Sequence, residues 1–146
     1  MKYTTSITIE RSPSDVFALM EDPANMPHWQ DGLVSFTPTS PDPHAPGATA
    51  DIVFMMGKKE VQMVETLVER DPPRLYTATY ETDGVWNLNK NIFTETGPNQ
   101  TEWRMEAEFR CSGFLRIMAF FMPGMFRKQS EKMMRDFKAL AEGTQA

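Results

Sequence analysis

The sequence predicts a single domain of the α+β class, in which a seven-stranded antiparallel sheet curves around a long C-terminal helix. Three observations support this fold. Short segments between residues 3 and 111 alternate apolar and polar side chains, as half-buried strands do. The connections between these segments are short and rich in turn-forming residues. From about residue 115 onward, apolar residues recur with a helical period, and the length of 146 residues suits one domain.

The N-terminal part of the chain begins with a strand and continues into two short helices. Residues 2–10, KYTTSITIE, alternate with the period of a strand that has one buried face. Ser12 is a suitable N-cap, Pro13 suits a first helical position and Asp15 complements the helix dipole. We therefore expect a helix here, followed by one further helical turn within residues 24–32.

Six further strands are expected between residues 33 and 111. The loops between most of them are too short for parallel crossovers, which need a dozen residues or more, so neighbouring strands should run antiparallel. The predicted strands span residues 33–40, 48–56, 59–70, 74–82, 85–95 and 101–111.

The strand at 101–111 has the clearest pattern of the six. Apolar residues alternate with charged ones, so the apolar set should face the core and the charged set the solvent. The apolar set consists of Trp103, Met105, Ala107, Phe109 and Cys111.

The strand at 59–70 leaves two orientations open. If Met63 faces inward, Glu65 faces inward too, whereas Val64 and Val68 support the opposite orientation equally well. A register change of one residue turns every side chain of a strand to the other face, so the orientation of Glu65 stays open at this point.

The strand at 85–95 raises the same question. We favour an inward Trp86 and solvated asparagines, because alternation normally hides the apolar side. In the opposite orientation the asparagines would form a polar wall for hydroxyl or carbonyl groups of a ligand. The first set contains Trp86, Leu88 and Ile92, and the second contains Asn87, Asn89 and Asn91. The adjacent strand poses the same choice between Tyr76 and Tyr80 on one face and Thr77 and Thr79 on the other.

The C-terminal helix is expected to run from about Arg116 to Glu142, about 40 Å at 1.5 Å per residue, and to cross the concave face of the sheet. Pro123 removes a backbone donor and Gly124 adds freedom, so a kink or a fresh start is expected near residues 119–124. The chain has 12 methionines, several of them on this helix, and methionine adapts to irregular space. A ligand cavity beneath the helix would use that property, although a plain core of Met and Phe would give the same pattern.

Composition and charge argue against several function classes. The formal charge of −5, with 15 scattered basic residues, disfavours a nucleic-acid partner. The single cysteine, Cys111, excludes an intrachain disulfide and fits a cytoplasmic protein. The two histidines form no recognisable metal-site spacing, so we expect neither a metal nor a cofactor. The N-terminus lacks the apolar core of a signal peptide, and no apolar window is long enough for a transmembrane helix.

Three segments carry a family resemblance that covers about residues 3–142. They are ITIERSPSDVFALMEDPANMPHWQDG, LVERDPPRLYTATYE and FRKQSEKMMRDFKALAE. These segments resemble the N-terminal signature, the strand–DPP–strand segment and the C-terminal helix of the SRPBCC superfamily, which includes START-type lipid carriers and polyketide cyclase/dehydrase-like proteins. The resemblance implies the helix-grip fold, with a cavity between sheet and helix that takes lipids, polyketides, quinones or other hydrophobic compounds.

The resemblance places a small hydrophobic ligand in this cavity, and the predicted strand and helix faces supply its lining. Glu65 would be an acid or base inside the cavity, and His28, near its expected mouth, would bind or shuttle a proton. The commoner interpretation of both is a solvent-exposed side chain. The expected ligand-binding residues are Trp29, Phe54, Met63, Trp86, Trp103, Met105, Phe109, Met118, Phe121, Met122, Met125 and Gln129.

We expect a protein that binds a hydrophobic or amphipathic molecule without chemistry of its own. The alternative is an enzyme of the polyketide cyclase or dehydratase type, with Glu65 or His28 as its base. The sequence predicts no oligomeric state.

A third hypothesis is a partner-binding module for a membrane complex, which predicts that the Met and Phe surface at residues 118–126 is exposed. Basic residues beside this surface would then make a peripheral contact with anionic headgroups, although bases on a helix more often form its solvated side. These residues are Arg116, Arg127, Lys128 and Arg135.

Overall fold

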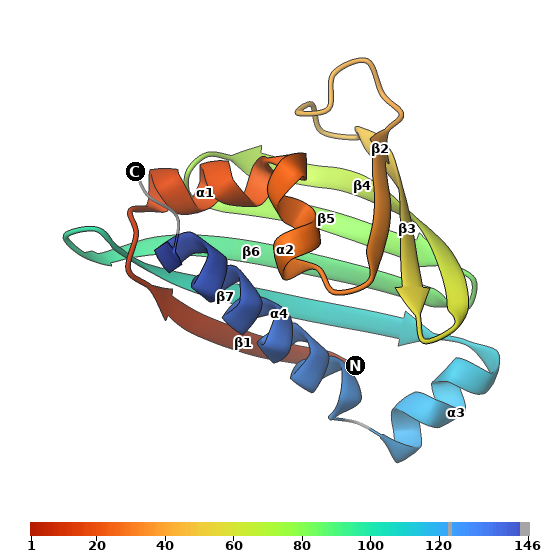
Figure 1. Ribbon diagram of the computed structural model, residues 1–146. Coiled ribbons are helices and arrows are strands. Elements are labelled where there is room, and N and C mark those ends of the chain that lie inside the picture. Colours follow the sequence, from red (N-terminus) through yellow and green to blue (C-terminus); the bar gives the residue numbers. More distant parts are fainter. Residues whose placement is uncertain (123, 144–146) are drawn as a thin grey trace.

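The computed structural model describes residues 1–122 and 124–143 and contains the predicted order of elements (Figure 1). A 3₁₀ turn, η1, lies between the first two helices. The elements are β1 (Lys2–Ile9), α1 (Pro13–Glu21), η1 (Pro23–Asn25), α2 (Met26–Trp29), β2 (Leu33–Pro38), β3 (Thr49–Met56), β4 (Lys59–Asp71), β5 (Leu75–Thr82), β6 (Val85–Gly97), β7 (Gln100–Cys111), α3 (Gly113–Phe121) and α4 (Met125–Gly143).

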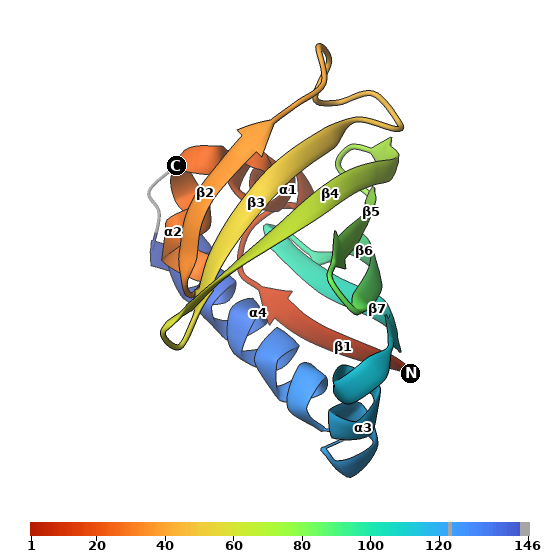
Figure 2. The same ribbon diagram turned by 90° about the vertical axis from the view of Figure 1, so that its right-hand side faces the viewer.

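The seven strands form one antiparallel sheet in the order β1-β7-β6-β5-β4-β3-β2. Strands β2 to β7 follow one another as a meander, and β1 pairs with β7, where Tyr3 lies opposite Ala107. The sheet curves so that β2 and β3 stand over the concave face, which the view in Figure 2 shows from one end. This arrangement confirms the predicted α+β, helix-grip fold.

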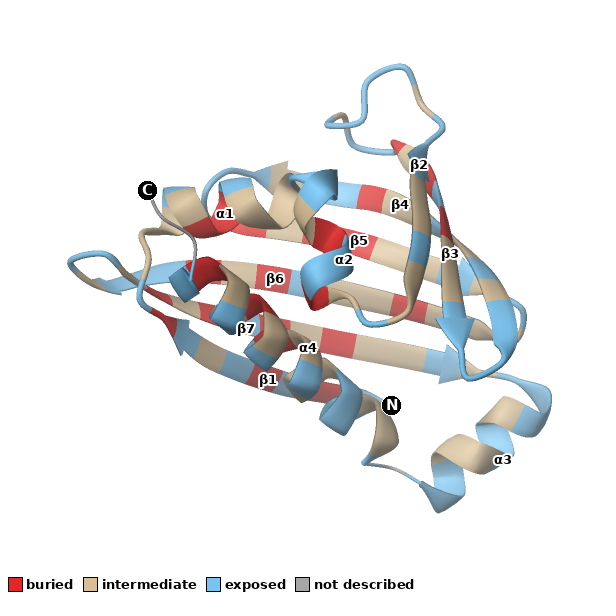
Figure 3. Cartoon of the chain, viewed as in Figure 1, coloured by how far each residue is buried: buried red, intermediate tan, exposed pale blue. Residues whose placement is uncertain are grey.

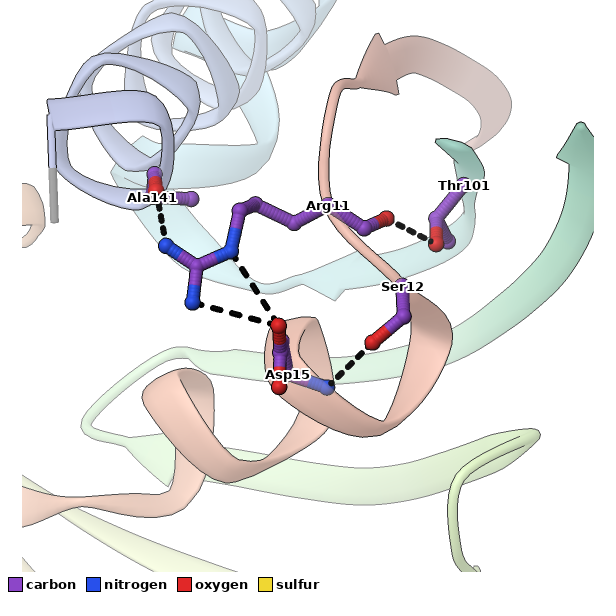
Figure 4. Close-up of polar contacts among 5 residues, drawn as sticks. All are labelled: Arg11, Ser12, Asp15, Thr101 and Ala141. Atoms are coloured by element: carbon purple, nitrogen blue, oxygen red, sulfur yellow. Dashed lines mark hydrogen bonds and ion pairs between the residues drawn. The ribbon is translucent and has the colours of Figure 1, made fainter. Parts of the chain in front are cut away.

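Helix α1 starts where the sequence predicts, and the junction before it joins three elements (Figure 4). The Ser12 hydroxyl accepts a hydrogen bond from the Asp15 amide at 3.2 Å, which satisfies one free donor of the first turn. The Arg11 guanidinium donates to the Asp15 carboxylate at 3.2 Å and to the Ala141 carbonyl of α4 at 3.1 Å. Thr101 of β7 donates to the Arg11 carbonyl at 2.7 Å. These bonds hold the C-terminal end of α4 and the start of α1 against the sheet.

The apolar core occupies one side of the concave face, between strands β1, β6 and β7 and helices α1, α2 and α4 (Figure 3). Its centre is aromatic: the Phe137 ring of α4 lies 5.2 Å from the Trp29 ring and 5.4 Å from the Trp103 ring, both in edge-on contact. Met105 and Met134 are buried beside these rings. We call this region the filled half of the concave face.

The C-terminal helix has the predicted break but differs from the prediction in its course over the sheet. α3 ends at Phe121 and α4 begins at Met125, so the predicted break is present; Pro123 itself lies outside the described residues. α4 lies along β1 and α2 and does not cross the strands β3 to β5. α3 turns away from the axis of α4 and projects beyond the end of the sheet (Figures 1 and 2).

No helix in the described parts of the chain is long and apolar enough to span a bilayer.

Candidate functional site

Strand β4 directs Glu65 onto the concave face. Val61, Met63 and Glu65 lie opposite Phe54, Ile52 and Ala50 of β3, and these side chains are buried or partly exposed. Val64 and Val68 lie on the outer side and are 41% and 47% exposed. The two orientations left open by the sequence have a simple origin, because these two valines are apolar residues that stand on the solvent side of β4.

Tyr76 and Tyr80 of β5 point to the same place as Glu65. Tyr80 lies directly opposite Glu65 in the β4–β5 register, and the Tyr76 hydroxyl donates to the Glu65 carboxylate at 3.3 Å. All three side chains remain partly exposed to solvent. We call these three residues the carboxyl–tyrosine cluster.

Burial dominates the electrostatics of this cluster. It raises the pKa of Glu65 above its ordinary value of 4.5, while hydrogen bonds from Tyr80 and Tyr76 oppose the rise. Burial also raises the pKa of both tyrosines, and the negative charge of Glu65 adds to that effect. Burial therefore shifts the pKa of Glu65 in the direction of the protonated carboxyl and keeps both phenols neutral, and phenol hydroxyls can donate hydrogen bonds to an oxygen-bearing ligand.

The asparagines of β6 face inward, contrary to the orientation favoured from the sequence. Asn87 lies opposite Tyr80, and Asn91 lies opposite Tyr76. Asn91 accepts a hydrogen bond from the buried indole nitrogen of Trp103 at 2.9 Å and donates to the Tyr76 carbonyl at 3.2 Å. The asparagines are compatible with the buried face because most of their hydrogen bonds are made within it.

Asn89 differs from its two neighbours. Its cross-strand neighbours are Ala78 of β5 and Ala107 of β7, which are buried and small. No large side chain therefore stands beside Asn89 in these two pairs. Its carbonyl oxygen accepts a hydrogen bond from Asn87 at 3.1 Å, and its amide nitrogen has no partner among the described residues. Asn89 is partly exposed, so this donor is available to a bound molecule.

Trp86 lies on the opposite side of β6 from the asparagines, which corrects the prediction that it lines the cavity. It pairs with Arg110 of β7, whose guanidinium lies 4.5 Å from the centre of the indole ring on the convex face. A cation over the ring explains how a tryptophan is accommodated on the solvent side of the sheet.

The other predicted lining residues divide into three groups. Trp29, Trp103 and Met105 are packed in the filled half and are not accessible to a ligand in this structure. Phe54, Met63, Phe109, Met118 and Met125 are partly exposed, and Phe54 and Met63 lie near the carboxyl–tyrosine cluster. Phe121, Met122 and Gln129 are exposed. We call the surface formed by Phe54, Val61, Met63, Glu65 and Tyr80 the open half of the concave face.

His28 is exposed on α2, which packs against α4, whereas Glu65 lies on β4. It borders a surface depression of about 340 Å³ between α2 and α4, together with Asn25, Asp136 and Leu140. The structure therefore does not bring the two candidate acid–base residues together.

Comparison with solved structures identifies the same fold in proteins of distant sequence. TTHA0849 from Thermus thermophilus has a TM-score of 0.76 at 14% identity, with 99% of this chain and 100% of that chain covered. Ara h 8.0201 has a TM-score of 0.76 at 10% identity, with 99% of each chain covered. Norcoclaurine synthase from Thalictrum flavum, in complex with dopamine and hydroxybenzaldehyde, has a TM-score of 0.71 at 14% identity, with 100% of this chain and 88% of that chain covered.

A search of curated proteins found no match to the sequence. A family model described as polyketide cyclase / dehydrase and lipid transport matches residues 1–142, which is nearly the whole chain. This match shows that the chain belongs to the polyketide cyclase/dehydrase and lipid transport family of the SRPBCC superfamily, and the helix-grip fold agrees with it.

Proposed function

We propose that the protein binds a small amphipathic molecule on the open half of the concave face, without chemistry of its own. One observation carries the proposal: the carboxyl–tyrosine cluster and Asn89 are inward-facing polar groups that keep access to solvent. In a closed core such groups would be fully paired with one another.

The chemistry of this surface indicates how a ligand would be oriented. Glu65, Tyr80 and Asn89 offer hydrogen bonds to hydroxyl or carbonyl oxygens, whereas Phe54 and Met63 offer apolar contact. Ligand sites commonly combine such an apolar wall with a few convergent polar groups. The solved structure of norcoclaurine synthase with two small aromatic molecules supports the use of this fold for ligands of that size.

The proposal is tested by native mass spectrometry of the purified protein, followed by titration with fluorescent fatty-acid and quinone probes. We expect a co-purifying molecule or saturable probe binding. Tyr80→Phe and Glu65→Gln should weaken binding by roughly 5- to 100-fold, because each deletes a hydrogen-bonding group of a partly buried site. Trp86→Phe, on the convex face, is the matched control and should bind like the wild type. The absence of both ligand and probe binding would contradict the proposal.

A second candidate function is acid–base catalysis of a cyclisation or dehydration by Glu65. The raised pKa of this carboxyl and its hydrogen bond from Tyr76 favour it, since a general acid or base works best with a pKa near the working pH. The two phenols would stabilise an enolate-like oxygen as charge develops.

This candidate is tested with a polyketide-like substrate. Glu65→Gln should abolish turnover while leaving the fold largely intact, and His28→Gln should leave turnover unchanged. Equal turnover in the wild type and in Glu65→Gln would exclude Glu65 as the catalytic group.

A further inference from the structure

Helix α3 exposes an unusually apolar surface. Its side chains are apolar apart from Arg116, and none of them is buried. The side facing the protein carries Leu115, which packs over the β5–β6 turn at Gly84. On its solvent side Phe114, Phe120 and Phe121 are 72%, 79% and 73% exposed. These three rings alone present roughly 450 Å², from a typical aromatic area of about 200 Å² each, which is as large as the largest apolar patch of most soluble monomers.

A second apolar tip lies at the same end of the molecule. The β3–β4 hairpin carries Met55 and Met56, which are exposed, followed by Lys58 and Lys59. Figure 1 places this hairpin and α3 at one end of the sheet, and Figure 2, which looks onto that end, shows them on either side of α4. Two segments far apart in the sequence thus bring exposed apolar residues to the same end of the molecule.

Charge distinguishes the segment around α3 from the rest of the chain. Residues 112–130 contain Arg116, Arg127 and Lys128 and no acidic residue, a charge of +3. Since the whole chain has a formal charge of −5, the remainder carries −8. Exposed phenylalanines with basic residues nearby in the sequence are typical of interfacial helices that lie on anionic bilayers.

We propose that α3 and the β3–β4 tip dock on an anionic membrane surface, with Phe114, Phe120 and Phe121 in the headgroup region. Arg116, Lys128 and Lys58 are exposed and pair with lipid phosphates. A second copy of the chain is the weaker occupant, because two such basic surfaces would repel each other.

Docking in this position would give the bound ligand a source, namely the membrane. This part of the inference rests on the proposed ligand binding. α3 follows β7 directly and connects to α4, so it lies at the end of the sheet where a molecule would leave a bilayer for the concave face (Figure 2). The occupant of the concave face would then be a membrane-soluble compound.

The test is co-sedimentation of the full chain with vesicles of phosphatidylcholine, with and without phosphatidylglycerol. We expect binding that needs the anionic lipid and weakens with added salt. Phe120→Ser with Phe121→Ser should weaken partitioning by at least about tenfold. Arg116→Glu with Lys128→Glu should weaken it by at least about fivefold, and only on anionic vesicles. Val64→Ser with Val68→Ser removes exposed apolar surface on the convex face and should bind like the wild type.

Hydrogen exchange locates the contact. Amides of residues 113–121 should exchange more slowly with anionic vesicles than without them. No vesicle binding, or equal loss in the phenylalanine and valine variants, would overturn the proposal. So would a dimer in sedimentation equilibrium that the phenylalanine substitutions dissolve.

Probe binding without vesicles separates the two proposals. The phenylalanine variant should still bind probes on the concave face, and Glu65→Gln should still bind vesicles. If only the probe assay fails, the ligand-binding proposal is wrong. If only the vesicle assay fails, the membrane-docking proposal is wrong.

Discussion

The two halves of the concave face are built from neighbouring strands of one sheet, yet they differ in packing. In the filled half, α4 places Phe137 against Trp103 and Trp29, and the polar atom of Trp103 is paired with Asn91. In the open half, none of the described helices crosses Met63 and Glu65, and both keep access to solvent. The difference teaches that close packing and ligand contact are concentrated in different parts of the concave face, so substitutions should separate them too.

The largest effect is expected in the filled half. Phe137→Ala should lower the free energy of unfolding by about 3–5 kcal/mol, because it removes the ring at the centre of the aromatic contacts. Urea denaturation measures this. Phe54→Ala, in the open half, is the matched control and should lose much less. Similar losses in the two variants would show that the halves are equally packed.

A smaller loss is expected where the two halves meet. Asn91→Ala leaves the buried indole N–H of Trp103 without its acceptor and should cost about 1–3 kcal/mol of unfolding free energy. Asn89→Ala, two residues along the same face, should cost clearly less because Asn89 is partly exposed. If both variants unfold at the same urea concentration, the proposed division of roles along β6 is wrong.

The pH dependence of stability sharpens the comparison further. Because burial raises the pKa of Glu65, the folded protein holds this proton at pH values where the unfolded chain has released it. Wild-type stability should therefore fall, relative to Glu65→Gln, as pH rises from about 4.5 through the higher pKa of the folded state. Denaturation of both proteins across this pH range measures the difference. An unchanging difference would contradict the burial of Glu65.

The smallest effect on stability is expected for Met63→Ala in the open half. Its side chain is already partly hydrated in the folded protein, so the loss should be about 1 kcal/mol or less. Probe affinity should nevertheless fall, since Met63 lies beside the carboxyl–tyrosine cluster. A large loss of stability with unchanged probe affinity would assign Met63 to the core instead.

The sequence predicted the order of elements because that order depends on local signals. The Ser12 cap, the short turns and the alternation in β7 are each confined to a few residues, and the structure confirms all three. The break between α3 and α4 was predicted for the same reason, from the helix-breaking chemistry near residues 119–124.

The orientation of the site residues depended on long-range information. Exposed valines on the outer side of β4 make either orientation fit the alternation, and only the pairing with β3 and β5 decides between them. In β6, the apolar rule failed because Trp86 is covered by Arg110 and the asparagines are satisfied by partners from other strands. Placing β6 against the clear pattern of β7, with Asn89 opposite Ala107, would have given the correct orientation.

The pairing of β1 with β7 has a consequence for how the chain folds. Tyr3 and Ala107 lie side by side although they are far apart in sequence, and α4 packs on β1. The first strand of the chain therefore packs between two of its last elements. Contacts of such high sequence separation slow folding, because a long loop must close before they form. During synthesis, the first strand leaves the ribosome well before its neighbour exists. The first strand therefore stays unpaired until β7, which ends at Cys111, has emerged, and this interval is when a chaperone would be needed.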